Sequence, residues 1–415
     1  MAYIGPNTRL RRVVSDLITG HRPIKIAVIG GSVSWGLAAE VGKNDWFTVF
    51  SRYMSDAFPR AELTFTNGCV PSTGTPFMIL CLELYVNADV DLVFSEYMLN
   101  DGALILQHNG FVSRGVPTEL DDGIESGTGI KHALFADTPE DAYGAVSQYY
   151  GAPSLSLRSA VYRLAMAKRV PGFQWKDIMH IDRLHPSVKG HKCMADLAVW
   201  LIQQTALDVF MRPMAKEDVE MVTEPLPDPI FPNNLPPAHA MCLWQEMLRP
   251  AVVESDGWEF INEGTEEKPK KGYVTTTPDV PLTLCLNTSS DGSNFSVTVA
   301  IAHLKSYDEN MGIATVSCVA NCSCTPVLMD GWHTDQSSQT YMATVTPTQH
   351  EACIMAITVH ATRALGTEDG QWLPGTKFKV SGVMFTEGSN NVADDQDRRF
   401  KATGWASGLS ETDSS

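Results

Sequence analysis

A serine follows the first strongly apolar segment of the sequence, in a setting that suits a nucleophile. The segment from Ile24 to Ile29 is predicted to be a β-strand, and it leads into the sequence GGSVSWG at residues 30–36. At the carboxyl end of a parallel strand, a side chain faces the crevice in which α/β proteins bind ligands. Ser32 is therefore a candidate nucleophile if a base can reach it. The alternative interpretation is a tight turn between a strand and a helix.

Other glycine motifs fit residues 30–36 poorly. A P-loop needs a lysine before its serine or threonine, and a dinucleotide-binding fingerprint needs the pattern G-x-G-x-x-G. The nucleophile elbow G-x-S-x-G places a glycine two residues after the serine, where this chain has Ser34. These comparisons leave a serine nucleophile as the preferred hypothesis.

Asp182 and His185 could supply the base, within the segment HIDRLHP at residues 180–186. Histidine is the usual proton acceptor for a serine nucleophile, and a carboxylate fixes its tautomer and stabilises the imidazolium. An isolated D-x-x-H spacing also arises by chance. A second alternative is a metal site, because His180 and His191 are close in the sequence, although no further acidic and histidine cluster completes such a site.

Acyl transfer also needs hydrogen-bond donors for the oxyanion. Asn100 offers a side-chain amide after the third predicted strand, the turn at residues 67–69 offers backbone N–H groups after the second, and Ser32 offers its own N–H. Carboxyl ends of parallel strands meet at one edge of a sheet, so these groups could converge on one crevice.

The elements that must position these residues alternate between strands and helices. Such alternation predicts a parallel α/β sheet. Further strands are expected near residues 62–66 and 90–97, and helices at 46–58, 160–168 and 188–207.

After residue 210 the pattern changes. Seven prolines between residues 211 and 237 predict an extended linker or a strap across the first domain. Short β-rich segments then follow one another between turn residues, which is typical of a sandwich or jelly roll. These segments are 273–276, 282–286, 295–304, 314–319, 341–345, 353–360 and 378–385. We therefore expect an α/β domain at 21–210, a linker at 211–240, an all-β domain at 241–388 and a disordered tail at 389–415.

Length and composition limit the classes of partner that the protein could bind. A length of 415 residues suits two domains, and the net charge of −17 disfavours a nucleic-acid or anionic-membrane binder. No apolar run reaches the ~18 residues of a transmembrane helix. The N-terminus lacks the apolar core of a signal peptide, so we expect either an intracellular protein or a targeting segment upstream of this chain.

The nine cysteines fall into two groups. Those in apolar runs are expected to be buried small hydrophobic residues, namely Cys69, Cys81, Cys193, Cys242, Cys285 and Cys353. The cluster of Cys318, Cys322 and Cys324 allows a disulfide, free thiols or a metal site. Three N-x-S/T sequons, at Asn287, Asn294 and Asn321, are a faint hint of a secretory context.

The four polar segments, in their order, resemble the SGNH (GDSL-like) hydrolase superfamily. They read GGSVSWG, NGCVPSTG, MLND and DRLH. The resemblance covers about residues 24–207 and implies a flavodoxin-like three-layer α/β domain with no cofactor and no metal. It implies that Ser32 is the nucleophile, His185 the base and Asp182 its orienting partner, with Asn100 and Gly68 as oxyanion donors. Cys69 and Gly74 are alternatives to Gly68, and Met98 stands where the superfamily has a glycine.

A second, weaker resemblance concerns the two-domain architecture. Residues 148–158 resemble a segment of superfamily members tied to capsule or cell-surface polysaccharide. The C-terminal half, with SYDENMG and CVANCSC, resembles the β-rich appendage of such proteins from algae and related eukaryotes. This resemblance implies an acylated glycan as substrate, with a small acyl ester as the alternative.

One departure from the pattern concerns the fourth strand. The apolar run at residues 103–106 follows Asp101 almost at once, whereas a parallel strand needs a crossover of roughly a dozen residues. The run is helical, or it pairs antiparallel or leaves the sheet, or a crossover helix has been lost. Residues 109–140 are expected to form a long loop.

Three functions are compatible with these residues and motifs. The first is an esterase that hydrolyses O-acyl, above all O-acetyl, groups on a carbohydrate through an acyl-enzyme. The second is an acyltransferase with the same triad. The third is a degenerate hydrolase that serves as a glycan-binding module, in which Trp258, Trp332 and Trp372 either stack on sugars or belong to the core.

Overall fold

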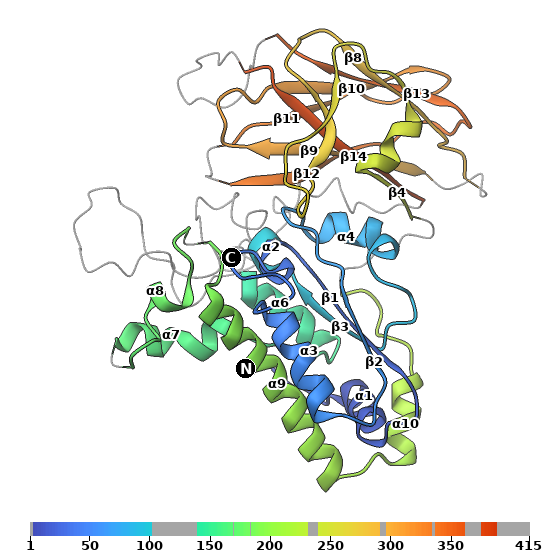
Figure 1. Ribbon diagram of the computed structural model, residues 1–415. Coiled ribbons are helices and arrows are strands. Elements are labelled where there is room, and N and C mark those ends of the chain that lie inside the picture. Colours follow the sequence, from blue (N-terminus) through green and yellow to red (C-terminus); the bar gives the residue numbers. More distant parts are fainter. Residues whose placement is uncertain are drawn as a thin grey trace, which may run out of the picture. The chain divides into compact units, whose positions relative to one another are not determined.

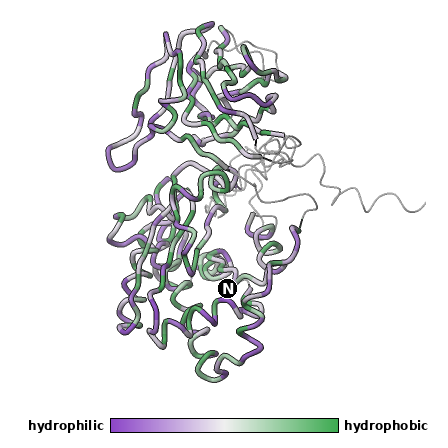
Figure 2. Tube along the Cα trace, turned by 90° about the vertical axis from the view of Figure 1, so that its right-hand side faces the viewer, coloured by the Kyte–Doolittle hydropathy of each residue, from purple (hydrophilic) through white to green (hydrophobic). Residues whose placement is uncertain are grey.

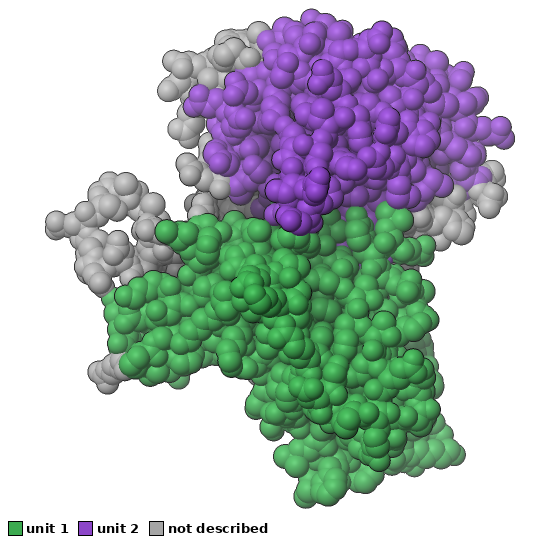
Figure 3. Space-filling model, viewed as in Figure 1, with its two compact units in different colours: residues 1–75, 83–230 green, residues 76–82, 231–415 purple. Residues whose placement is uncertain are grey.

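The computed structural model describes residues 3–101, 139–168, 170–182, 184–230, 240–290, 296–333, 337–361 and 375–387. The chain forms two compact units (Figure 3). Unit 1 comprises Met1–Thr75 and Glu83–Ile230, and unit 2 comprises Pro76–Leu82 and Phe231–Ser415. Among the described helices, none has the length and apolar character needed to cross a bilayer.

Unit 1 is built on a parallel sheet with the strand order β2-β1-β3 (Figure 1). The strands are β1 (Ile24–Gly30), β2 (Leu63–Asn67) and β3 (Leu92–Glu96). Ile26 of β1 lies opposite Phe65 on one side and Leu92 on the other. The three predicted strands and their parallel arrangement are confirmed, and β1 is the central strand because its apolar side chains are buried on both faces.

Three helices pack together against this sheet: α1 (Thr8–Thr19), α3 (Trp46–Ala57) and α9 (Val188–Met211). Helix α3 begins where the sequence predicts, because the Asp45 carboxylate accepts a hydrogen bond from Thr48 N–H at 2.9 Å. The apolar residues of α1 recur at helical spacing and are buried, although this helix precedes the domain start expected at residue 21. Together with the sheet, these three helices form the hydrophobic core of unit 1.

The remaining α-helices in the described part of unit 1 are mostly short. They are α2 (Ser32–Trp35), α6 (Pro139–Tyr149), α7 (Leu157–Ala167), α8 (Trp175–Ile178) and α10 (Lys216–Thr223). Two of them correct the sequence-based expectations. The loop predicted to reach residue 140 ends earlier, because α6 begins at Pro139. The segment predicted as an extended linker contains α10, because no proline stands between Pro213 and Pro225.

The outer edge of β3 borders a cavity of about 630 Å³ within unit 1. No described strand pairs with this edge. Its walls include Leu92 and Phe94 from β3 and Leu197 and Leu201 from α9. The predicted fourth strand at residues 103–106 lies outside the described residues, as does the tail at 389–415.

Unit 2 contains two antiparallel sheets, with the strand orders β11-β10-β13-β8-β5 and β12-β9-β14-β7-β6. A further strand, β4, pairs with β14. The first sheet consists of β5 (Val252–Glu254), β8 (Pro281–Leu286), β10 (Ile313–Ala320), β11 (Val327–Asp330) and β13 (Cys353–Val359). The second consists of β4 (Ala240–Trp244), β6 (Glu259–Asn262), β7 (Lys271–Thr275), β9 (Val297–Ser306), β12 (Ser338–Val345) and β14 (Phe378–Glu387).

One hydrophobic core joins the two sheets of unit 2. Leu282 and Leu284 of β8 and Val299 and Ile301 of β9 are fully buried in it. Figure 2 colours the Cα trace by hydropathy, and hydrophobic and hydrophilic stretches are interspersed along it. The seven predicted strands are confirmed. The strands that sequence reasoning missed, β4, β5, β6 and β11, have three to five residues each, too few for a clear alternation.

Of the three tryptophans considered for sugar stacking, Trp258 belongs to the core. Its side chain is 5% exposed, and its Nε1–H donates to Val280 O at 3.1 Å. Trp332 is half-buried and pairs with Ser306 in an isolated bridge, whereas Trp372 lies outside the described residues. The core interpretation is therefore correct for Trp258.

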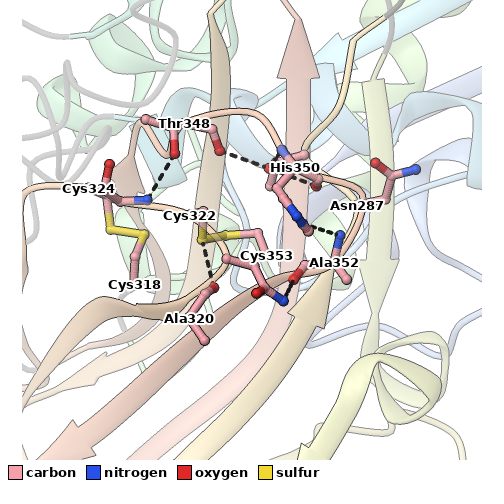
Figure 4. Close-up of a disulfide and its surroundings, with 12 residues drawn as sticks. Asn287, Cys318, Ala320, Cys322, Cys324, Thr348, His350, Ala352 and Cys353 are labelled. Carbon is pink, nitrogen blue, oxygen red and sulfur yellow. Dashed lines mark hydrogen bonds between the residues drawn. A yellow bond between two sulfur atoms is a disulfide. The ribbon is translucent and has the colours of Figure 1, made fainter.

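Three disulfides correct the expectation for several cysteines. Cys318–Cys324 and Cys322–Cys353 lie next to each other in unit 2 (Figure 4). A third disulfide joins Cys242 of β4 to Cys81, the last residue of α4 (Thr75–Cys81). Phe77 of α4 contacts the Trp244 ring, with 4.6 Å between centroids. The segment 76–82 therefore belongs to unit 2 although its sequence lies in the first half of the chain.

The thiol count follows from these pairs, since Cys69, Cys193 and Cys285 are the free cysteines. Titration of the denatured, unreduced protein with a thiol reagent is expected to find three thiols, and reduction should raise the count to nine. Mass spectrometry of unreduced peptides should recover the three pairs. Nine thiols before reduction would contradict this pairing.

Candidate active site

Ser32 stands at the carboxyl end of the central strand. β1 ends at Gly30, and Ser32 begins the one-turn helix α2. The Gly31 N–H donates to Glu96 O at 3.3 Å, which ties this turn to the end of β3. The Ser32 side chain is 7% exposed, so its hydroxyl is buried at the edge of the sheet where strand ends converge.

His185 lies in a loop that is closed by backbone pairing. Met179 and Pro186 form an antiparallel bridge, and His180 N–H donates to His185 O at 2.8 Å. Ser187 follows as the N-cap of α9, and its hydroxyl accepts a hydrogen bond from Gly190 N–H. The long helix α9, packed on α1 and α3, therefore holds the loop from its C-terminal side.

The loop brings His185 to Ser32. Ser32 Oγ and His185 Nε2 are 2.8 Å apart, and His185 Nδ1 and Asp182 Oδ2 are also 2.8 Å apart. The hydroxyl, the imidazole and the carboxylate thus form one continuous chain of hydrogen bonds, and the three sequence-predicted residues are brought together. A serine hydroxyl within hydrogen-bond distance of an oriented imidazole can lose its proton during attack on a carbonyl carbon.

Asp182 is held as an anion. Partial burial raises the pKa of its carboxyl group, but the backbone N–H groups of His185 and Leu184, with the His185 ring, outweigh burial and lower that pKa well below its usual value. The two N–H groups donate to Oδ1 at 3.0 and 2.9 Å, which leaves Oδ2 for the ring of His185. An anionic Asp182 fixes the Nδ1–H tautomer, so that Nε2 is the proton acceptor that faces Ser32.

Asn100 lies directly against the turn that carries Ser32. Its side chain is 5% exposed, and a Cβ atom on Gly31 would lie 2.0 Å from Asn100 Oδ1. The neighbouring Asp101 carboxylate anchors this segment, because it accepts hydrogen bonds from Thr75 N–H at 2.9 Å, from the Thr75 hydroxyl at 2.7 Å and from the Tyr143 hydroxyl. Asn100 is therefore a fixed polar group beside the serine, as an oxyanion donor must be.

The expectation that Gly68 is an oxyanion donor needs correction, because its N–H is already bonded. Its N–H donates to Val28 O at 2.9 Å and so extends the sheet. The N–H of Cys69, the alternative donor, donates to Asn67 Oδ1 at 3.1 Å. Both N–H groups are committed within the fold, so the remaining candidate donors are the N–H of Ser32, the side-chain amide of Asn100 and the N–H of Gly74. The sequence could not reveal the hydrogen bond of Gly68, because its partner, the Val28 carbonyl, belongs to another strand.

His191 does not join His180 and His185 in a metal site, because both of its ring nitrogens have other partners. His191 is buried, its Nε2 lies 3.0 Å from Leu37 O, and Trp46 N–H donates to its Nδ1 at 3.4 Å. Burial lowers the pKa of His191, which keeps the ring neutral. Within the described part of the chain, the one group spaced for a metal ion consists of disulfide cysteines of unit 2.

Glu96 is a site residue that sequence reasoning missed. It is the last residue of β3, and Ser34 Oγ donates to its Oε2 at 3.0 Å. Burial of the carboxyl group raises the pKa of Glu96 to about 7, and the charge of Asp101 adds to the rise, whereas Ser34 opposes it. A glutamate at the carboxyl end of an apolar strand was the available signal.

Comparison with solved structures identifies proteins with a similar fold. The structure is similar, with a TM-score of 0.61, to "a two-domain esterase (CEX) active on acetylated mannans"; the match covers 94% of this chain and 97% of that chain at 16% identity. A second structure of that esterase, co-crystallised with mannopentaose, matches with the same TM-score at 15% identity. No family model and no curated protein matches the sequence.

The fold is thus that of a two-domain protein like this esterase, in which an α/β domain with a parallel sheet is combined with a β-sandwich. This agrees with the fold class that the sequence predicts.

The close approach of Gly31 and Asn100 predicts a stability effect. Gly31→Ala places a methyl group against a short, buried side chain and should lower the free energy of unfolding by about 1–3 kcal/mol. Gly144→Ala is the matched control: a Cβ at this position in α6 meets nothing within 4 Å, and the change should stabilise the protein by about 0.5–1 kcal/mol. Urea titrations followed by circular dichroism measure both; equal effects would argue against the contact.

The raised pKa of Glu96 predicts a pH-dependent stability. A carboxyl group whose pKa rises on folding stabilises the fold fully below about pH 4.5, and this contribution disappears as the pH rises through about 7. Relative to Glu96→Gln, the wild type should lose about 2–3 kcal/mol between pH 5 and pH 8. Unfolding titrations of both proteins at several pH values test this, and a constant difference would rule it out.

Proposed function

We propose that this protein is a serine esterase that removes O-acyl groups from a carbohydrate by way of an acyl-enzyme. The observation that carries the proposal is the chain of hydrogen bonds from Ser32 through His185 to Asp182. Its support from outside the site is the similarity in fold to a two-domain esterase.

In the proposed reaction, Ser32 Oγ attacks the ester carbonyl carbon while His185 Nε2 takes the hydroxyl proton. The negative oxygen that forms is stabilised by Ser32 N–H and the Asn100 amide. His185 then gives its proton to the departing sugar oxygen, which leaves an acyl group on Ser32. Water attacks this ester with His185 again as the base, and the acid and free enzyme are released.

The substrate class rests on three considerations. The esterase with a similar fold is described as active on acetylated mannans, and the similarity extends over both domains. The net charge of −17 disfavours polyanionic substrates, whereas an acetylated neutral glycan is uncharged. Residues that resemble polysaccharide-associated superfamily members also lie in unit 1, at 148–158. We therefore propose O-acetyl groups on a neutral glycan.

Replacement of the nucleophile tests the reaction. Ser32→Ala should lower the kcat for hydrolysis of p-nitrophenyl acetate at least ~10³-fold, because no group remains to form the acyl-enzyme. Release of acetate from an O-acetylated mannan should fall equally. Ser55→Ala, which changes an exposed serine of α3, is the matched control and should retain wild-type activity.

Equal rates for wild type and Ser32→Ala would remove the esterase proposal. Transfer of the acetyl group to an added sugar, detected by mass spectrometry, would instead identify an acyltransferase with the same nucleophile.

A further inference from the structure

The helix that carries Ser32 is a single turn, and it contains a second serine, Ser34, whose side chain is buried. α2 spans Ser32–Trp35, too short to hold its own geometry. Its third residue, Ser34, is fully buried, and its side chain packs over Gly30, where a Cβ atom would lie 2.9 Å from Ser34 Cβ. An external support for this turn is therefore required.

Ser34 connects α2 to two other elements. Its hydroxyl donates to Glu96 Oε2 at 3.0 Å and accepts a hydrogen bond from Trp46 Nε1–H at 3.0 Å. Its carbonyl oxygen accepts from Asn67 Nδ2 at 3.2 Å. Glu96 ends β3 and Trp46 begins α3, so a polar chain runs from the sheet through the serine turn to the helix.

We infer that Glu96 is a positioning residue, which holds the nucleophile Ser32 in register with His185 through its hydrogen bond to Ser34. The inference rests on the proposed esterase function. Glu96 itself does not touch the reacting atoms in this role. A displacement of about 1 Å at a nucleophile can reduce a rate about 100-fold, so the register of this turn matters for catalysis.

The surroundings of Glu96 favour a neutral hydrogen-bonding group. Asp101 and the ionisable side chains of Cys69, Tyr97 and Tyr143 lie near enough to Glu96 to interact with its charge. All of these groups are neutral or negative at pH 7, and none is a cation that would pair with a carboxylate. Glutamine offers the same acceptor oxygen in the same volume. Glu96→Gln should therefore preserve the hydrogen bond from Ser34.

Four variants test the role of the hydrogen bond between Ser34 and Glu96. Glu96→Ala removes the acceptor of this bond and Ser34→Ala removes its donor. Each change should lower the kcat for p-nitrophenyl acetate about 10–100-fold, with KM changed less than about 3-fold. Glu96→Gln should keep kcat within about 3-fold of wild type. The double variant Glu96→Ala/Ser34→Ala should be no slower than the slower single variant, because each single change already removes the bond between the Ser34 hydroxyl and Glu96. Glu62→Ala, at an exposed glutamate, is the control.

The outcomes separate this inference from the proposed function. Loss of kcat in Ser34→Ala together with rescue by Glu96→Gln supports positioning, even if Glu96→Ala fails to fold. Wild-type kcat in Ser34→Ala, or a Glu96→Gln variant as slow as Glu96→Ala, would overturn it. Multiplied rather than shared losses in the double variant would do the same. By contrast, a wild-type protein without Ser32-dependent esterase activity would refute the proposed function itself.

Discussion

The hydrogen bond between Ser32 and His185 is the constraint on which the rest of unit 1 depends. The two residues are 153 positions apart in the sequence, and their side chains must meet within 2.8 Å. One is fixed by the central strand β1, and the other by a closed loop at the start of α9. The packing of α9 on α1 and α3 therefore does more than fill a core, because it determines where the imidazole lies.

Several polar groups around this pair are held by hydrogen bonds to their neighbours. Asp182 receives two backbone N–H groups and an imidazole N–H, and Asp101 receives the hydroxyl groups of Thr75 and Tyr143. Ser34 joins Glu96 in the same manner. Each of these networks ends next to a residue of the site, so these hydrogen bonds also orient Ser32, His185 and Asn100.

Unit 2 is stabilised in two ways, by an apolar core between two sheets and by disulfides. The pair Cys81–Cys242 closes a loop of 161 residues, a length for which chain-entropy arguments give about 5 kcal/mol of stabilisation. It also ties α4, which follows the turn after β2, to β4 of the sandwich unit. The folding of unit 2 thus requires a segment from the first half of the chain, and the three disulfides require oxidising conditions to persist.

Local patterns in the amino-acid sequence were enough to predict the strands β1, β2 and β3, the helices α3 and α9, and most of the sandwich strands, because hydrophobic periodicity and capping residues act over a few positions. They also singled out Ser32, Asp182, His185 and Asn100, whose types and spacing indicate their chemistry. Three features were decided by tertiary structure alone: Gly68 N–H belongs to the sheet, Cys81 pairs with Cys242, and Glu96 supports Ser34. The physical reason is common to all three, since each depends on a partner that is distant in sequence, and such partners become neighbours only when the chain has folded.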